Sequence, residues 1–304
     1  MARRIKRFGD IETHYELIGY IGGGAQGDLY LGQGLESDEL VAIKMQQERG
    51  FESEQRFAEL ARELTREGAY SHLVSEDLGG TLKLFGLGDY RGRRCIVLEY
   101  VDGVLLYDLM KEFRPMKDAG TVASIIGQLC EILDGIHRKG FVHRDLKPEN
   151  VMVEYSGRVR LLDLGLAVRA RQGTPFGCGT IGYAPLEQLE ANPDGVIAQA
   201  DIFALGCLLL ELTVMQLPYS GSRAGLMADT PVVLSADRLA EMPEEFATLA
   251  LSMVELSAKK RPSSVRAVFD RLRPHLPSVG APRPDKPLRP ADPTEYYRTC
   301  PPRW

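Results

Sequence analysis

The sequence lacks the cysteine patterns that mark disulfide scaffolds and zinc sites. Its five cysteines are scattered over 304 residues, and no two of them form a Cys-x-x-Cys pair. An odd and unpatterned set fits reduced thiols better than a disulfide framework, which is typical of small secreted proteins. We therefore expect a cytoplasmic protein.

The sequence also lacks a long apolar run and an excess of positive charge. The mildly basic start "MARRIKRF" is not followed by the apolar stretch of a secretory signal. The run "ALGCLLLELTV" is shorter than the roughly 18 residues that a membrane-spanning helix needs. A net charge of −5 and a pI near 5.7 give no electrostatic reason to bind nucleic acid or an anionic membrane. We expect no nucleic-acid or membrane partner.

Apolar sequence is abundant, at 44% of the chain, and it changes texture near residue 101. Before that point, "LVAIKM" and the paired runs "TLKLFGLGDY" and "RRCIVLEYV" predict strands, with one helix over residues 53–73. After it, residues 121–140 and 200–214 follow helical patterns. The sequence predicts an α+β protein with a small β-rich lobe (15–101) and a larger helical lobe (102–276).

The two ends of the chain differ from the lobes. Residues 1–14 precede the first lobe as an N-terminal extension. In the proline-rich C-terminal tail (277–304), four prolines between residues 284 and 293 recur at every third position, the period of an extended polyproline helix. The tail is either a solvated spacer or a docking segment, for a partner or for the chain's own second lobe. Its apolar anchors would be Tyr296, Tyr297 and Trp304.

A glycine pattern lies between the first two predicted strands. Gly22, Gly24 and Gly27 follow Gly-x-Gly-x-x-Gly spacing, and residues without a Cβ let backbone N–H groups approach phosphate oxygens. The same glycines could also form a plain hairpin turn. A dinucleotide-binding fold would need a helix at the third glycine, whereas "DLYLG" favours a strand.

Lys44 stands in the apolar run "VAIKM". A buried lysine is unfavourable unless an anion pairs with it, although a surface lysine can lay its stem along a sheet. A phosphate together with a carboxylate from the following glutamate-rich helix would satisfy it.

The segment "VHRDLKPEN" carries the strongest chemical signal. The carboxylate of Asp145 can orient and deprotonate an attacking hydroxyl. Lys147 can neutralise charge on a transferred phosphoryl group, and Asn150 offers an oxygen ligand for Mg²⁺. Asp163 offers a second ligand after the short hairpin "VMVEYSGRVRLLD". These residue types in this order predict phosphoryl transfer.

Together these segments resemble the serine/threonine protein kinases over roughly residues 15–273, by the established signature set of that family. The motif "DLKPEN" with "GT" is similar to the serine/threonine branch rather than the tyrosine branch. The resemblance implies the bilobal protein-kinase fold, with ATP and Mg²⁺ as cofactors. It also implies transfer of the γ-phosphoryl group to Ser or Thr hydroxyls of protein substrates, autophosphorylation included.

The resemblance also assigns roles to residues in both lobes. Thr180 would brace the base and Lys147, Asp201 would steady the catalytic loop, and Arg261 would pair with Glu187. Leu98 would be the gatekeeper. The catalytic set would be Asp145, Lys147, Lys44, Glu63 and Thr180, and the metal ligands would be Asn150 and Asp163. The ATP-contacting set would be Ile21, Gly22, Gly24, Gly27, Leu29, Ala42, Lys44, Glu99, Val101 and Met152.

Three positions depart from the family pattern. Leu164 replaces the usual phenylalanine after the metal aspartate, which alters packing and removes no chemical group. In "YAPLEQ" the proline has moved one place, so we expect a local backbone difference with activity retained. Glu63 best fits the family's distance from Lys44, but Glu67, on the same helix face, stands where an apolar residue is usual. Either the packing there is weak or the register is shifted.

One regulatory site is suggested by the resemblance. Arg144 precedes the base, and in this family such an arginine often meets a phosphate on the activation segment. Between Asp163 and Glu187, Thr174 is the hydroxyl left without an expected structural role, so we hypothesise that it is phosphorylated.

Two other functions were weighed against an active kinase. A nucleotide-binding pseudokinase that acts as a scaffold should have lost the lysine, the base or the metal aspartate, and the sequence retains all three. A small-molecule phosphotransferase of related fold would not need the peptide-binding segment "GTIGYAPLEQ" with Arg261. Both observations favour the protein kinase.

Overall fold

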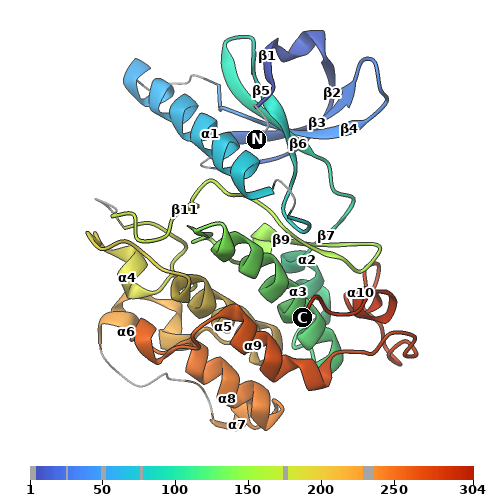
Figure 1. Cartoon of the computed structure of the whole chain (residues 1–304), viewed down its shortest axis with the longest axis vertical. Helices are drawn as coiled ribbons and strands as arrows, with labels where there is room; N and C mark the ends of the chain where they lie inside the picture. Colours follow the sequence, from blue (N-terminus) through green and yellow to red (C-terminus); the bar gives the residue numbers. More distant parts are fainter. Residues whose placement is uncertain are drawn as a thin grey trace. The chain divides into compact units, whose positions relative to one another are not determined.

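A computed structural model describes residues 5–24, 27–48, 53–75, 78–173, 177–228, 234 and 236–304. The chain divides into two compact units, Met1–Val101 (unit 1) and Asp102–Trp304 (unit 2). Unit 1 is drawn in blue to teal in Figure 1, and unit 2 runs from teal-green to red. The boundary follows Val101, close to the residue where the sequence changes texture.

Unit 1 is built on a six-stranded sheet with the order β1-β5-β6-β4-β3-β2. The strand β1 pairs parallel to β5, and the other neighbouring strands are antiparallel. The long helix α1 (Glu54–Ser75) packs on β5 and β6, as predicted from its helical spacing. The strands are β1 Arg7–Asp10, β2 Tyr15–Gly24, β3 Gly27–Gly34, β4 Leu40–Met45, β5 Leu84–Tyr90 and β6 Arg93–Glu99, and a 3₁₀ turn covers Ile11–Thr13.

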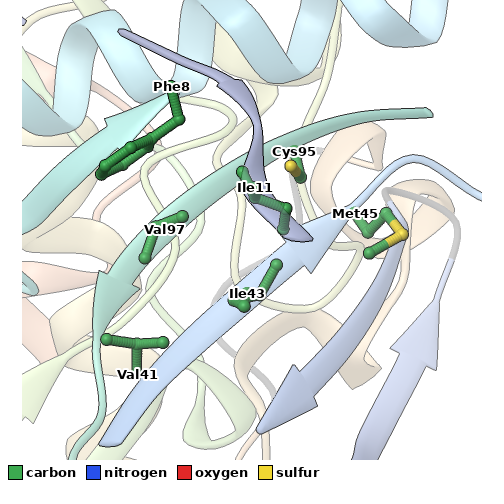
Figure 2. Close-up of a cluster of buried hydrophobic side chains, with 7 residues drawn as sticks. All are labelled: Phe8, Ile11, Val41, Ile43, Met45, Cys95 and Val97. Carbon is green, nitrogen blue, oxygen red and sulfur yellow. The ribbon is translucent and has the colours of Figure 1, made fainter. Parts of the chain in front are cut away.

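The N-terminal residues are part of this sheet rather than an extension before it. Phe8 and Ile11 are buried over β4 and β6 in the cluster shown in Figure 2. Two glycines of β5 make room for them: a Cβ on Gly86 would meet the Phe8 ring at 2.5 Å, and one on Gly88 would meet Ile11 at 2.5 Å. The full cluster is Phe8, Ile11, Val41, Ile43, Met45, Cys95 and Val97.

The core of unit 2 is formed by two apolar helices, α3 (Ala119–Arg138) and α5 (Gln199–Val214), which are buried along most of their length. The helix α3 begins where the Asp118 side chain accepts a hydrogen bond from Thr121 N, and it ends with basic residues, as helix termini favour. Among the described residues, α3 is the one helix long and apolar enough to cross a membrane, and 83% of that window is buried inside the protein. Here it is a core helix.

Shorter elements surround this core. A three-stranded sheet has the order β10-β9-β7, and β11 pairs with β8. The remaining helices are α2 Leu106–Phe113, α4 Leu186–Leu189, α6 Arg223–Met227, α7 Ala236–Leu239, α8 Glu244–Met253, α9 Val265–Leu272 and α10 Thr294–Thr299. The strands are β7 Gly103–Leu105, β8 Phe141–Val142, β9 Val151–Glu154, β10 Val159–Leu161 and β11 Val168–Arg169, with 3₁₀ turns at Pro148–Asn150, Pro218–Gly221, Ala258–Lys260 and Arg273–His275.

The proline-rich tail docks on unit 2 itself. Its helix α10, dark red in Figure 1, packs against α3. Tyr297 is fully buried, and the ring of Trp304 lies 4.8 Å from that of Phe269 on α9. Of the two interpretations of the tail, the structure has the docked one, onto the chain's own second lobe. The helix α10 itself was not predicted, because the periodic prolines concealed it.

Candidate active site

Unit 2 gathers the "VHRDLKPEN" residues around the buried carboxylate of Asp145. Thr180 Oγ1 donates a hydrogen bond to Asp145 Oδ1 at 2.6 Å, and Asn150 Nδ2 donates to Asp145 Oδ2 at 2.9 Å. Lys147 Nζ lies 3.2 Å from Asp145 Oδ2 and donates to Thr180 Oγ1 at 3.1 Å. Thr180 therefore contacts both Asp145 and Lys147, as expected, and the orientation of the carboxylate is fixed from three sides.

The backbone of this loop is held by Asp201 of α5. Its two oxygens accept hydrogen bonds from His143 N at 2.9 Å and Arg144 N at 2.8 Å, and His137 Nε2 lies 2.7 Å away. Arg144 has φ +72°, a left-handed conformation that needs such support. Burial alone raises the pKa of the Asp201 carboxyl, but the bonds from His137 and the backbone outweigh it, so the pKa lies below its ordinary value.

The segment predicted to bind peptide is anchored by Arg261. Its buried guanidinium donates to Glu187 Oε1 at 2.6 Å and to the backbone carbonyl of Gln199 at 2.9 Å. The displaced proline, Pro185, has extended backbone and directly precedes α4, and Glu187 lies in the first turn of that helix. The altered "YAPLEQ" order therefore leaves the expected Glu187–Arg261 pair in place.

Gln188 is a residue of the site that the sequence did not reveal. Its Nε2 donates to Arg144 O at 2.6 Å and to Cys178 O at 3.1 Å, so it joins the segment predicted to bind peptide to the predicted catalytic loop. The sequence offers no signal for this role beyond the position of Gln188 next to Glu187. Thr174, the hypothesised phosphosite, lies outside the described residues.

Asn150 and Asp163 lie at the base of one hairpin. Leu162 N donates to Asn150 O at 2.8 Å, which joins the two ends of β9–β10, and Asp163 follows directly. The Asn150 amide nitrogen is engaged with Asp145, so its other amide atom, the carbonyl oxygen, is the one left for a metal. Within the described ranges no group of three or more His, Cys, Asp or Glu side chains is placed so that it could hold a metal ion. An amide oxygen and a carboxylate suit a hard divalent cation that shares its coordination with phosphates and water.

In unit 1, Lys44 pairs with Glu67 and not with Glu63. Both carboxylate oxygens of Glu67 lie 2.8 Å from Lys44 Nζ, and the two side chains are 5% and 12% exposed. Glu63 lies one helical turn earlier, is 49% exposed and is 3.4 Å from Arg56. The prediction of Glu63 was wrong because the helix register is shifted by one turn, the alternative that Glu67 itself had suggested.

The predicted phosphate-covering glycines lie at the β2–β3 hairpin. Gly22 pairs with Leu29 and Gly24 with Gly27 across the two strands, and Gln47 Nε2 donates to Gly24 O at 3.0 Å. Gly27 has φ +136°, and a Cβ there would lie 2.5 Å from Met45 O, so glycine is required. The hairpin geometry by itself fits both a phosphate loop and a plain turn.

The remaining members of the predicted ATP-contacting set, and the predicted gatekeeper Leu98, come from both units. In unit 1, Ala42 and Leu98 are buried in one cluster, Glu99 ends β6, and Ile21 is 47% exposed on β2. The other members are Leu29 on β3 and Val101 in unit 1, and Met152 on β9 of unit 2.

Comparison with known proteins identifies the family. The family model described as "Protein kinase domain" matches residues 15–271. A "Probable serine/threonine-protein kinase PknB" of Lactococcus lactis is 30% identical over 221 residues, which cover 70% of this chain and 34% of that protein. The serine/threonine-protein kinase PknB of Mycobacterium tuberculosis is 29% identical over 242 residues, 77% of this chain and 36% of that protein.

A third relative is the serine/threonine-protein kinase pkn2 of Myxococcus xanthus, 27% identical over 277 residues, 86% of this chain and 32% of that protein. The chain thus spans about a third of the length of these curated relatives. The matched region contains Lys44, Asp145 and Arg261, whose surroundings were described above. The chain belongs to the serine/threonine protein kinase family.

Proposed function

We propose that the chain is an active kinase that transfers the γ-phosphoryl group of Mg·ATP to Ser or Thr hydroxyls of proteins, its own included. The observation that carries the proposal is the arrangement around Asp145, in which Thr180, Lys147 and Asn150 fix one carboxylate. A structural role alone would not require a lysine, an amide and a hydroxyl to converge on a single buried carboxylate.

Asp145 is the proposed base. The substrate hydroxyl donates its proton to this carboxylate while its oxygen forms a bond to the γ-phosphorus. The bond from that phosphorus to the β–γ bridging oxygen breaks, and ADP leaves. Lys147, 3.2 Å from the carboxylate, supplies positive charge where negative charge builds on the transferred group.

The remaining roles belong to the nucleotide and the metal. Lys44, oriented by Glu67, would contact the α- and β-phosphates. Asn150 and Asp163 would hold Mg²⁺, which supplies charge neutralisation at the phosphates. The donor set of one amide oxygen and one carboxylate fits this ion.

The two alternatives are less well supported. A pseudokinase scaffold would tolerate loss of the Asp145 contacts, yet the loop retains all of them. A small-molecule phosphotransferase would not need the buried Glu187–Arg261 anchor of the peptide-binding segment. The proposed partners are therefore proteins with Ser or Thr acceptors, and the exposed stretch of the tail around Arg283 and Arg289 remains available to a docking partner.

The proposal is tested by labelled phosphate transfer from ATP to a generic protein and to the chain itself. We expect Asp145→Asn and Asp163→Ala each to abolish most transfer, with losses of about 10²–10⁴-fold. Tyr107→Phe, which changes an exposed side chain of α2, is the control and should match the wild type. Transfer that survives both aspartate changes would refute the assigned roles.

A further inference from the structure

The tail contacts the hairpin that carries the proposed metal ligands. The family match ends at residue 271, so the tail is a feature of this chain outside the matched domain. One set of its contacts with the rest of unit 2 lies at the turn of the β9–β10 hairpin, whose opposite end bears Asn150 and Asp163. The hairpin therefore contacts the tail at its turn and carries the proposed metal ligands at its base.

Gln128, buried in the middle of α3, is the centre of these contacts. Its Oε1 accepts a hydrogen bond from Val159 N at 2.8 Å, and its Nε2 donates to Gly157 O at 3.1 Å and to Pro293 O at 3.2 Å. One amide side chain therefore joins the hairpin, the core helix and the tail. Because an amide has a separate donor and acceptor, few other residues could satisfy all three backbone groups in a buried position.

The turn is shaped to accept the tail. Gly157 has φ +83°, and a Cβ at this position would lie 2.4 Å from Asp292 O and 3.1 Å from Tyr296 N. The Asp292 carbonyl and the Glu295 Cβ of the tail therefore lie directly against the hairpin turn. A solvated spacer would not require such a close backbone approach.

The tail is fixed to the helix by Tyr297. Its ring is fully buried, and its hydroxyl donates to Glu131 Oε1 at 3.2 Å. Glu131 comes three residues after Gln128 in α3, so the two side chains lie on the same face of the helix. A Cβ on Gly127 would meet that hydroxyl at 3.1 Å, so a second glycine makes room for the tail. Arg303 N donates to the same Glu131 oxygen at 3.1 Å.

We propose that the docked tail braces the β9–β10 hairpin through Gln128 and thereby positions Asn150 and Asp163 to hold the divalent metal. Gln128 and Tyr297 are positioning residues, since neither touches the reacting groups. The inference rests on the proposed function only in the identity of the metal ligands. The physical basis is that a hairpin closed at its base by the Leu162–Asn150 hydrogen bond transmits displacement of its turn to its two ends.

The test uses the full chain with Tyr297→Ala and, as a matched control, Tyr107→Ala, which removes the same atoms from an exposed position on α2. The first measurement is hydrogen exchange of the backbone amides of residues 157–162 without nucleotide. The second is the Mg²⁺ concentration that gives half of the ATP-dependent rise in melting temperature. The third is the Mg²⁺ dependence of phosphate transfer.

We expect Tyr297→Ala to accelerate exchange in the hairpin and to raise the half-saturating Mg²⁺ concentration. Substitution of a residue that hydrogen-bonds to a metal ligand typically changes metal affinity by about 10–100-fold. The tail does not contact the ligands directly, so we expect a smaller rise in the half-saturating Mg²⁺ concentration, about three- to tenfold. The transfer rate at saturating Mg²⁺ should change little, and Tyr107→Ala should match the wild type. A loss that merely reflected weaker folding would lower the maximal rate and not be rescued by Mg²⁺.

Folded Tyr297→Ala with unchanged hairpin exchange or unchanged Mg²⁺ half-saturation would overturn the proposal. If that variant does not fold, Gln128→Met replaces it, because it keeps the volume in α3 and the Tyr297 anchor while removing all three bonds to the backbone. The same two results in Gln128→Met would then decide the question. A wild-type chain that shows the Mg²⁺-dependent melting shift but no transfer would contradict the proposed function alone.

Discussion

The two units hold their candidate catalytic residues in different ways. In unit 2, Asp145 is bound by neighbours in its own loop and by Thr180, and the loop backbone is held by Asp201 from a buried helix. In unit 1, Lys44 pairs with both carboxylate oxygens of Glu67, which lies on one face of α1. The core of unit 2 therefore holds Asp145 in position, whereas the pairing of Lys44 in unit 1 depends on the position of α1. A helix face is easier to displace than a core.

The largest effect should come from breaking an anchor in unit 2. Arg261→Met removes the buried partner of Glu187 and leaves the carbonyls of Gln199, Glu255 and Leu256 without their donor. We expect a loss of about 3–5 kcal/mol in the free energy of unfolding, because breaking one side of a buried pair leaves unsatisfied groups. Urea unfolding followed by circular dichroism checks this. Arg223→Met, which removes an exposed pair with Glu190, is the control and should change stability by less than about 1 kcal/mol.

In unit 1, we expect loss of the Lys44–Glu67 pair to reduce activity without unfolding the protein. In Lys44→Met/Glu67→Leu both partners become apolar, which is often nearly neutral for stability. We expect the melting temperature to stay close to that of the wild type, while transfer falls by about 10²–10³-fold because the charge at the phosphates is lost. A double variant that unfolds would show that the two units do not differ in this respect.

Glu67 and Glu63 provide a finer test within α1. Glu67→Gln keeps the shape of the Lys44 partner but removes its charge, so we expect about a tenfold loss of transfer, the difference between a charged and a neutral hydrogen bond. Glu63→Gln, on the exposed part of the same helix, should have no effect on transfer. Measurement of kcat and KM for ATP in the two variants checks the register. The reverse ranking would restore Glu63 as the partner of Lys44.

The sequence indicated which residues of the candidate catalytic loop would lie together, because they are close in the chain. Asp145, Lys147 and Asn150 lie within six positions, so their relative placement follows from one turn of backbone. The Lys44 partner could not be settled in this way, because glutamates one turn apart on α1 are equivalent until the length of the preceding segment is known. Glu67 was nevertheless marked as out of place in the sequence.

The ends of the chain were predicted least well. The sequence set residues 1–14 apart from the lobe, whereas Phe8 and Ile11 are buried in the core of the sheet. The strand β1 was not predicted because it is short and lacks an alternating pattern of buried residues. The sequence did not decide whether the tail is a solvated spacer or a docking segment. The proline periodicity predicts an extended conformation but does not show whether that segment is buried. Its docking depends on Gly127 and Gly157, which lie far from it in sequence and carry no pattern of their own.

The smallest predicted effect concerns pH and the tail anchor. Burial raises the pKa of the Glu131 carboxyl, and the Arg303 backbone N–H, the Arg303 charge and the Tyr297 hydroxyl only partly oppose this. The folded state therefore holds its proton more tightly than the unfolded state, whose pKa is near the ordinary 4.5. The resulting stabilisation is complete below that pH and is lost as the pH rises through the folded pKa.

Glu131→Gln should remove this pH dependence. Trp304 is the single tryptophan of the chain and packs on Phe269 and Arg266, so its fluorescence reports on the docked tail. The urea midpoint of the wild type should fall relative to that of Glu131→Gln as the pH is raised from 4.5 towards neutrality. Midpoints that stay parallel across this range would mean that Glu131 titrates alike in the folded and unfolded states. The cost of burying the carboxylate would then be balanced by its contacts with Arg303 and Tyr297, and the ionisation of Glu131 would make no net contribution to holding the tail.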